Sequence, residues 1–173
     1  IIDLIKKKHK VYVFANNFNS NSMKLFYDIG AFPIYFDLNS NKNNLIFDFI
    51  NIIKLGFKLK KHRIDLTLSY FLKPIITTSI AAKLFFIKNN YIFFEGLGSN
   101  FSNYENYKGN NQHPSFLLKI LLFVSISFSL KSIVINKEDL LDLSKINKKI
   151  LKNNLILGPI GLSLNYYKYS KID

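Results

Sequence analysis

Polar and glycine residues that end two apolar runs are the residues of this sequence best suited to chemistry. The run 66–70 leads into Lys73, and the run 91–94 leads into Glu95 and the glycine-bearing turn 96–98. An ammonium group can bind a phosphate, and a carboxylate can bind a sugar hydroxyl or affect proton transfer. Ligands in open α/β sheets bind at the carboxyl ends of the strands, so we predict a binding site where these runs end.

Each of these candidates also has a purely structural interpretation. Lys73 could be a solvated lysine at the turn before Pro74, and Glu95 a solvated loop carboxylate. Gly96 and Gly98 free the backbone to approach a ligand closely, but they are equally typical of a plain turn. The sequence leaves both interpretations open.

Several further polar residues lie at predicted strand ends or in the segments that follow them. Ser69 and Tyr70 are either polar ligands or strand-end packing, and packing is favoured for Tyr70. Asn136 and Asp139 could shape the rim of a cleft, although Asn136 is also a good N-cap for the following helix. His113 stands alone in a long polar segment, without an identified partner.

Short apolar runs alternate with helical segments along the chain. The predicted strands are 11–15, 33–37, 66–70, 91–94, 132–135 and 155–157. The predicted helices are one that ends near Lys8, then 23–29, 45–61, 75–88, 114–130 and a stretch within 136–148. The clearest helix, 45–61, has apolar residues spaced three or four apart at Ile46, Phe49, Ile50, Ile53 and Phe57. This alternation predicts an α/β fold, with six strands side by side in one parallel sheet and helices on both faces.

Composition narrows the classes of function. The chain of 173 residues has the length of one domain, and it contains no cysteine, which excludes a disulfide scaffold or a thiolate site. No metal motif, dinucleotide fingerprint or P-loop is present, and no pattern favours nucleic acid. The net charge of +13 indicates either an anionic partner or lysine-rich codon usage. The apolar run 116–130 is too short for a bilayer span.

Five motifs, in this order, carry a family resemblance. They are Asp65–Pro74 (Asp-Leu-Thr-Leu-Ser-Tyr-Phe-Leu-Lys-Pro), Ser79–Leu84, Gly96–Gly98, Asn136–Asp139 and Gly158–Leu162. Together they resemble the N-terminal domain of family 4 glycosyltransferases, which have the two-domain GT-B architecture. The most similar members appear among bacterial enzymes that act on lipid-linked saccharides.

The resemblance implies a Rossmann-like half of a GT-B enzyme over residues 1–157, with an interdomain linker starting in 158–173. It implies a retaining hexosyltransferase that moves a sugar from a nucleotide sugar, a UDP-sugar, to a lipid-linked saccharide in surface polysaccharide or glycan biosynthesis. No cofactor or metal is implied, and the enzyme would work at the cytoplasmic face of the inner membrane. The family's first strand and its C-terminal domain have no counterpart here, so we expect the isolated chain to be inactive.

The residues that the resemblance assigns to acceptor or substrate binding lie at the ends of predicted strands or after them. They are Ser69, Lys73, Glu95, Gly96, Gly98, Asn136 and Asp139. A non-catalytic binding module of the same fold is the alternative. Two surfaces suit a membrane, the basic cluster Lys54, Lys58, Lys60, Lys61 and Arg63 and the aromatic segment Phe101, Tyr104 and Tyr107.

Overall fold

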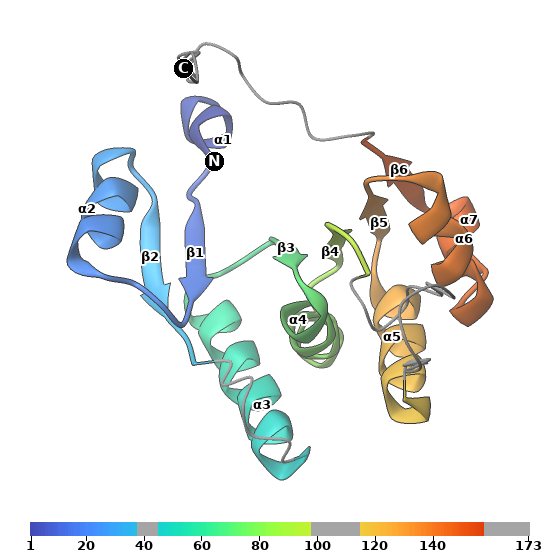
Figure 1. The fold of residues 1–173 in the computed structure, drawn as a ribbon. Helices are drawn as coiled ribbons and strands as arrows, with labels where there is room; N and C mark the ends of the chain where they lie inside the picture. Colours follow the sequence, from blue (N-terminus) through green and yellow to red (C-terminus); the bar gives the residue numbers. More distant parts are fainter. Residues whose placement is uncertain (38–44, 98–114, 158–173) are drawn as a thin grey trace, which may run out of the picture.

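A computed structural model describes residues 1–37, 45–97 and 115–157 of the chain (Figure 1). Strands and helices alternate, which confirms the predicted α/β fold. The strands are β1 (Tyr12–Ala15), β2 (Phe32–Tyr35), β3 (Leu66–Tyr70), β4 (Asn89–Phe94), β5 (Lys131–Val134) and β6 (Asn154–Ile156). The helices are α1 (Ile2–Lys6), α2 (Ser20–Asp28), α3 (Leu45–Lys61), α4 (Leu72–Leu84), α5 (Phe116–Phe128), α6 (Lys137–Ile146) and α7 (Lys149–Lys152).

The strands form two parallel sheets, whereas the sequence predicted one sheet of six. β1 pairs with β2, and the second sheet has the order β3-β4-β5-β6. The predicted parallel direction is confirmed within each sheet. The single sheet is wrong for the described residues because β1 and β3 are not hydrogen-bonded to each other. Figure 1 shows the two sheets beside each other, with β1 and β3 as the facing strands.

Helix α3 has the predicted bounds, but a different face of it is buried. Phe49 and Phe57, which belong to the predicted apolar stripe, are mostly exposed, while Ile52, Leu55 and Leu59 are buried. The buried residues pack in a cluster with Phe36, Ala81, Ala82 and Ile87. The partner of α3 is therefore α4, and two small alanines let the two helices approach closely.

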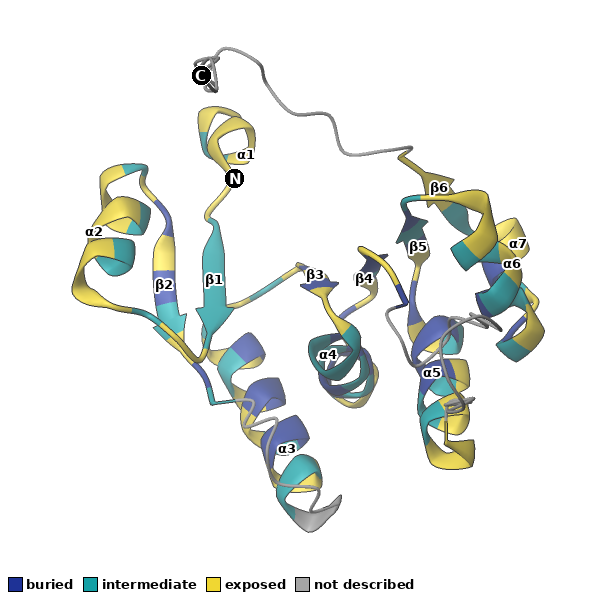
Figure 2. Ribbon diagram, in the orientation of Figure 1, coloured by how far each residue is buried: buried dark blue, intermediate teal, exposed yellow. Residues whose placement is uncertain are grey.

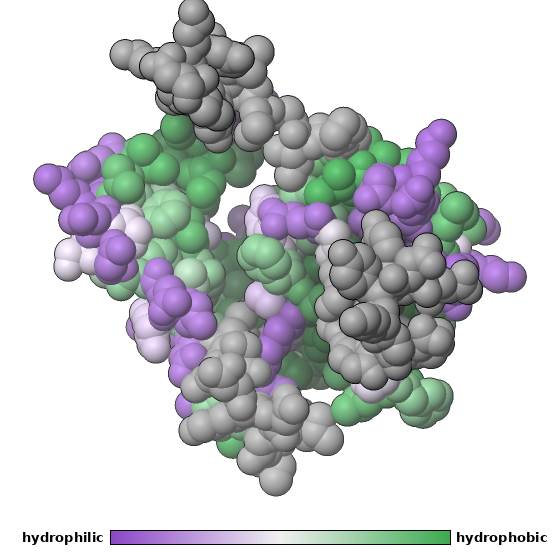
Figure 3. Space-filling model, viewed as in Figure 1, coloured by the Kyte–Doolittle hydropathy of each residue, from purple (hydrophilic) through white to green (hydrophobic). Residues whose placement is uncertain are grey.

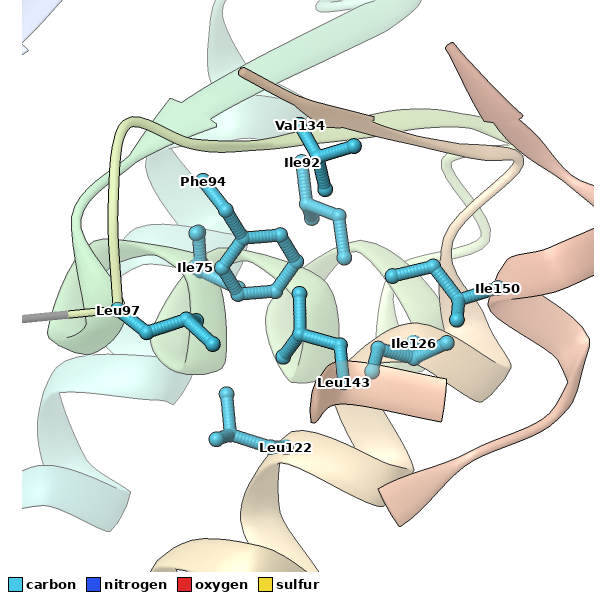
Figure 4. Packing of buried hydrophobic residues seen from close by; sticks show 9 residues of the cluster. All are labelled: Ile75, Ile92, Phe94, Leu97, Leu122, Ile126, Val134, Leu143 and Ile150. Carbon is cyan, nitrogen blue, oxygen red and sulfur yellow. The ribbon is translucent and has the colours of Figure 1, made fainter. Parts of the chain in front are cut away.

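The main core lies between the four-stranded sheet and helices α4 to α7 (Figure 4). Phe94, Leu97 and Leu143 turn toward one another there, and Ile75 and Leu122 complete the same cluster. Figure 2 shows that buried residues concentrate on α3, α4, α5 and the central strands, whereas α1 and α2 are mostly exposed.

A buried polar contact fixes the position of α4 on the sheet. The Asn90 side chain on β4 accepts a hydrogen bond from Thr67 Oγ1 at 2.9 Å and donates one to Ser79 Oγ at 3.0 Å. All three side chains are buried. Because a buried amide without partners is costly, these bonds favour one alignment of β3, β4 and α4.

Candidate functional site at the carboxyl ends of β3, β4 and β5

The carboxyl ends of three neighbouring strands meet at one edge of the larger sheet. Tyr70 at the end of β3 is opposite Phe93 on β4, and Phe94 is opposite Val134 at the end of β5. The segments that leave these strands therefore start side by side. We call the residues Ser69, Tyr70, Phe71, Glu95, Gly96, Asn136 and Asp139 the carboxyl-edge site.

Tyr70 and Glu95 interact across the ends of β3 and β4. Burial raises the pKa of the Tyr70 hydroxyl above its ordinary value, and the negative charge of Glu95 raises it further. The Tyr70 ring also packs edge-on against Phe93, with 5.2 Å between ring centroids. The favoured packing role of Tyr70 is consistent with this contact, while its neutral hydroxyl stays available as a hydrogen-bond donor or acceptor.

Asp139, in the segment after β5, forms a hydrogen bond with the Leu97 N–H in the segment after β4. Asn136 caps α6, since its Oδ1 accepts a bond from the Asp139 N–H at 2.7 Å, and its Nδ2 donates to Asp139 Oδ2 at 3.0 Å. Burial raises the pKa of Asp139, and the charges of Asp142 and Glu138 add to the rise. Hydrogen bonds from the Asn136 side chain and the Leu97 N–H oppose it. Asp139 therefore anchors the turn that carries Glu95.

Phe71 connects β3 to α4 in an unusual backbone conformation. Its φ is 64° and its ψ is 152°, a combination that residues with a side chain rarely adopt. Such strain is concentrated at functional sites, where the surrounding structure enforces it. The Phe71 side chain is exposed, and α4 begins beside it without a side-chain cap. The positive end of the α4 dipole therefore faces the same edge.

Ser69 and Lys73 flank this strained residue. The Ser69 Oγ is buried, and it has no hydrogen-bond partner within the described residues. The ammonium group of Lys73 lies 2.9 Å from a carboxylate oxygen of Asp48 on α3. This ion pair connects α4 to α3. The sequence predicted either a phosphate ligand or a solvated lysine at position 73, and neither prediction included a pairing with Asp48.

Gly96 is exposed, and it has a φ of 150°, which favours glycine. A methyl group added there would meet no atom within 4 Å, so the space beside this turn is open. The other predicted residues lie outside the described residues: Gly98, Phe101, Tyr104, Tyr107, His113 and the segment 158–173.

The structure thus brings together Tyr70, Glu95, Asn136 and Asp139 at one edge. Three features of the site were not predicted from the sequence: Phe71, Asp48 and the bond from the Leu97 N–H to Asp139. Phenylalanine rarely adopts a positive φ, so its presence at position 71 does not indicate one. Asp48 lies far from Lys73 in the sequence, so no local pattern predicts that these two residues form an ion pair.

Among residues 1–37, 45–97 and 115–157, no group of three or more His, Asp or Glu side chains could hold a metal ion. No helix in that part of the chain has the length and apolar character needed to cross a membrane. No model of a known protein family matches the sequence, and no curated protein matches it either.

Proposed function

We propose that this chain is the acceptor-side domain of a glycosyltransferase that moves a sugar from a nucleotide sugar, a UDP-sugar, to a lipid-linked saccharide. One observation carries the proposal: hydrogen-bonding groups from three adjacent strand ends converge at the carboxyl edge of a parallel sheet. Transfer to a hydroxyl group requires the acceptor to be held in one orientation, and convergent polar groups on rigid strands provide that. The motif resemblance supports the same function.

Each part of the carboxyl-edge site has a role in this proposal. The carboxylates of Glu95 and Asp139 accept hydrogen bonds from sugar hydroxyls. The exposed Phe71 ring offers an apolar surface for one face of a sugar ring, and the start of α4 attracts the diphosphate of the lipid carrier. In this proposal a second domain binds most of the nucleotide sugar. The residues of the carboxyl-edge site therefore position the acceptor but do not catalyse sugar transfer on their own.

Calorimetry with three soluble probes tests this acceptor role. The probes are a farnesyl-diphosphate-linked hexose, farnesyl diphosphate and UDP. We expect the hexose-bearing probe to bind the 173-residue chain most tightly, and Glu95→Gln or Asp139→Asn to weaken that binding about tenfold, the effect of one lost charge-assisted bond. Asp65→Asn is the control, because it removes one carboxylate before β3, at the end of the strand away from the site.

Two results would contradict the acceptor role. One is the absence of saturable binding of the hexose-bearing probe at millimolar concentration. The other is equal weakening by Asp65→Asn and Glu95→Gln, which would mean that only the overall charge of the protein affects binding.

We further propose peripheral contact with an anionic membrane surface, through a cationic patch at the opposite, amino-terminal edge of the sheet. Three cations, Lys60, Arg63 and Lys88, and one carboxylate, Asp65, line a cavity of about 420 Å³ there. Phe86 beside them is 83% exposed. None of the three cations forms an ion pair within the described residues. Cations combined with an exposed aromatic ring suit anionic head groups and the lipid interface.

Vesicle sedimentation tests the cationic patch. We expect binding to vesicles with phosphatidylglycerol and none to pure phosphatidylcholine, with a severalfold loss in Arg63→Gly. This substitution removes the charge, while glycine accepts the positive φ of 51° at that position. Lys145→Gly, on α6, is the matched loss of one charge. Equal loss in the two variants would contradict a localised patch.

A further inference from the structure

The cavity at the amino-terminal edge of the larger sheet is separate from the carboxyl-edge site. It lies where α3 ends before β3 and where α4 ends before β4. Its volume of about 420 Å³ is typical of sites for small molecules. Hydrophilic side chains occur on several sides of the molecule, over α2 and over α6 and α7 in Figure 3, so hydrophilic surface alone does not locate a site. The cavity gives a ligand a defined place.

The apolar part of the cavity lining is buried, and the charged part is exposed. Leu59 and Ile87 are buried, whereas Lys60, Arg63 and Lys88 are exposed. Two elements contribute the cations, since Lys60 and Arg63 come from the end of α3 and Lys88 comes from the segment between α4 and β4. A ligand in the cavity would therefore meet positive charge from two sides.

The charge of the lining suits a phosphate monoester. One carboxylate, Asp65, also lines the cavity, but no ion pair joins it to these cations within the described part of the chain. Three positive side chains and one negative side chain leave a net charge of +2. A phosphate monoester carries about −1.5 to −2 at pH 7. The guanidinium of Arg63 adds a planar fork of N–H groups that matches phosphate oxygens.

The helix ends beside the cavity have side chains at positions where glycine is the usual residue. Helices α1 to α4 all end in the same turn, in which one backbone bond spans three residues and the next spans five. The residue at the turn has a positive φ, and in α2 it is Gly30. The other three turns carry a side chain, at Lys8, Arg63 and Phe86. Two of these three side chains flank the cavity, which indicates a role other than folding.

The same turns remove an obstacle to anion binding. The carboxyl end of a helix carries partial negative charge on carbonyl groups that lack hydrogen bonds. Here the carbonyls of Leu59 and Lys60 at the end of α3 accept bonds from the turn, and so do those of Ala82 and Lys83 at the end of α4. The exposed cations are therefore the main charges that a ligand in the cavity would meet.

We propose that this cavity binds one phosphate monoester, with its phosphate against Lys60, Arg63 and Lys88 and its attached group against Phe86. The Phe86 ring lines the same cavity and is 83% exposed, so it offers an apolar surface at the rim. The phosphate belongs to a lipid head group, as in phosphatidic acid, or to a small soluble ester, because both have the same dianionic group. For a lipid source the inference rests on the proposed membrane contact, which it narrows to one head group.

Calorimetry with three soluble probes tests the cavity. The probes are glycerol 3-phosphate, its diester glycerophosphoglycerol, and glycerol. We expect saturable binding of the monoester in the millimolar range. The diester should bind severalfold more weakly, because it carries less negative charge, and glycerol should not bind.

Two variants test the cations that line the cavity. Arg63→Gly should weaken binding of glycerol 3-phosphate about tenfold, the effect of one lost charge-assisted bond. It should not lower thermal stability, because glycine accepts the φ of 51° at that position. A purely structural role of Arg63 would leave the affinity unchanged. Lys88→Gln should weaken binding in the same direction. Lys152→Gln, on α7 outside the cavity, is the control and should change the affinity little.

Vesicles of equal surface charge separate the two sources of phosphate. One set contains phosphatidic acid, and the other contains phosphatidylglycerol. A preference for phosphatidic acid that Phe86→Gly abolishes assigns the phosphate to a lipid, and glycine accepts the φ of 61° there. Binding of glycerol 3-phosphate without that preference assigns the phosphate to a soluble ester.

Two results would overturn the cavity site. One is the absence of saturable monoester binding together with the absence of a preference for phosphatidic acid. The other is equal weakening by Arg63→Gly and Lys152→Gln, which would mean diffuse attraction. Binding to phosphatidylglycerol vesicles that persists in the first case would reject the cavity site but keep the membrane contact. Saturable monoester binding without any vesicle binding would reject the membrane contact alone.

Discussion

The two sheets differ in how much core supports each of them. Nine buried apolar residues support the larger sheet, and they come from helices α4 to α7, strands β4 and β5 and the turn after β4. In the smaller unit, β1–α2–β2, no residue of β1 or α2 is fully buried. This unit depends on Phe36 and Phe14, which reach the separate cluster between α3 and α4. Figure 2 shows the contrast.

The comparison shows that the same local motif, parallel strands joined by a helix, can differ greatly in stability between two parts of one molecule. Both units consist of parallel strands joined by helices, and both sheets have the same kind of hydrogen bonds. Free energy follows the apolar area removed from water, however, and most of that area lies behind the larger sheet. We therefore expect the smaller unit to open first, as regions with few buried apolar contacts do.

The largest expected effect is on the main core. Phe94→Ala should lower the free energy of unfolding by about 3–5 kcal/mol, because it removes a ring that is 1% exposed and leaves a cavity. Phe32→Ala, at a ring that is 44% exposed on β2, is the matched change in the smaller unit and should cost about 1 kcal/mol. Urea unfolding measures both values, and similar losses would refute the contrast between the two units.

The next effect is at the contact between α3 and α4. Helix propensity alone predicts that Gly56→Ala stabilises α3 by about 1 kcal/mol. A methyl group at Gly56 would, however, overlap with ring atoms of Phe85, the residue that ends α4. We expect a net loss of about 1–3 kcal/mol from this overpacking. Lys54→Ala on the exposed side of α3 is the control and should change stability little. A stabilised Gly56→Ala protein would show that α4 is not packed this closely.

A smaller, pH-dependent effect is expected at Asp139. Its raised pKa means that the folded state binds the proton more tightly than the unfolded state does. The ionised carboxyl therefore costs stability above its folded pKa, and this cost disappears as the pH falls below the ordinary value of 3.8. Asp139→Asn should be more stable than the natural protein at neutral pH, with a difference that shrinks toward pH 3. A difference that grows as the pH falls would contradict the burial of Asp139.

The smallest effect is a shift in one titration. Glu95→Gln should lower the pKa of the Tyr70 hydroxyl, because it removes a nearby negative charge, but burial should keep that pKa above 10.0. Ultraviolet difference titration against Tyr70→Phe isolates this group. Asp65→Asn, at the amino end of β3, is the matched loss of one carboxylate. If Asp65→Asn shifts the pKa of the Tyr70 hydroxyl equally, the effect of Glu95 does not come from its position beside Tyr70.

Local patterns predicted the main elements of the fold well. The bounds of α3 and β3 agree with the structure, and Asn136 is confirmed as the cap of α6. Helix α2 begins earlier than predicted, at Ser20, because Asn19 and Ser22 form a reciprocal capping box that recruits a polar segment into the helix. Helix α4 also begins earlier, at Leu72, because Phe71 makes the turn out of β3 within a single residue.

The candidate site was predictable only in part. The positions of Glu95, Asn136 and Asp139 after their strands follow from the order of the elements, and parallel pairing then brings them to one edge. Their contacts do not follow from that order. Leu97 reaches Asp139, and Lys73 reaches Asp48, across segments that are distant in sequence.

The sequence by itself determined which segments become helices and strands, because apolar spacing and capping residues act within a few positions of one another. Only the tertiary structure decided which face of α3 is buried, which carboxylate binds Lys73, and how the strands divide between two sheets. Those outcomes depend on the packing of surfaces far apart in the chain. An amphipathic pattern indicates that one face of an element is apolar, but it does not indicate which other part of the chain packs against that face.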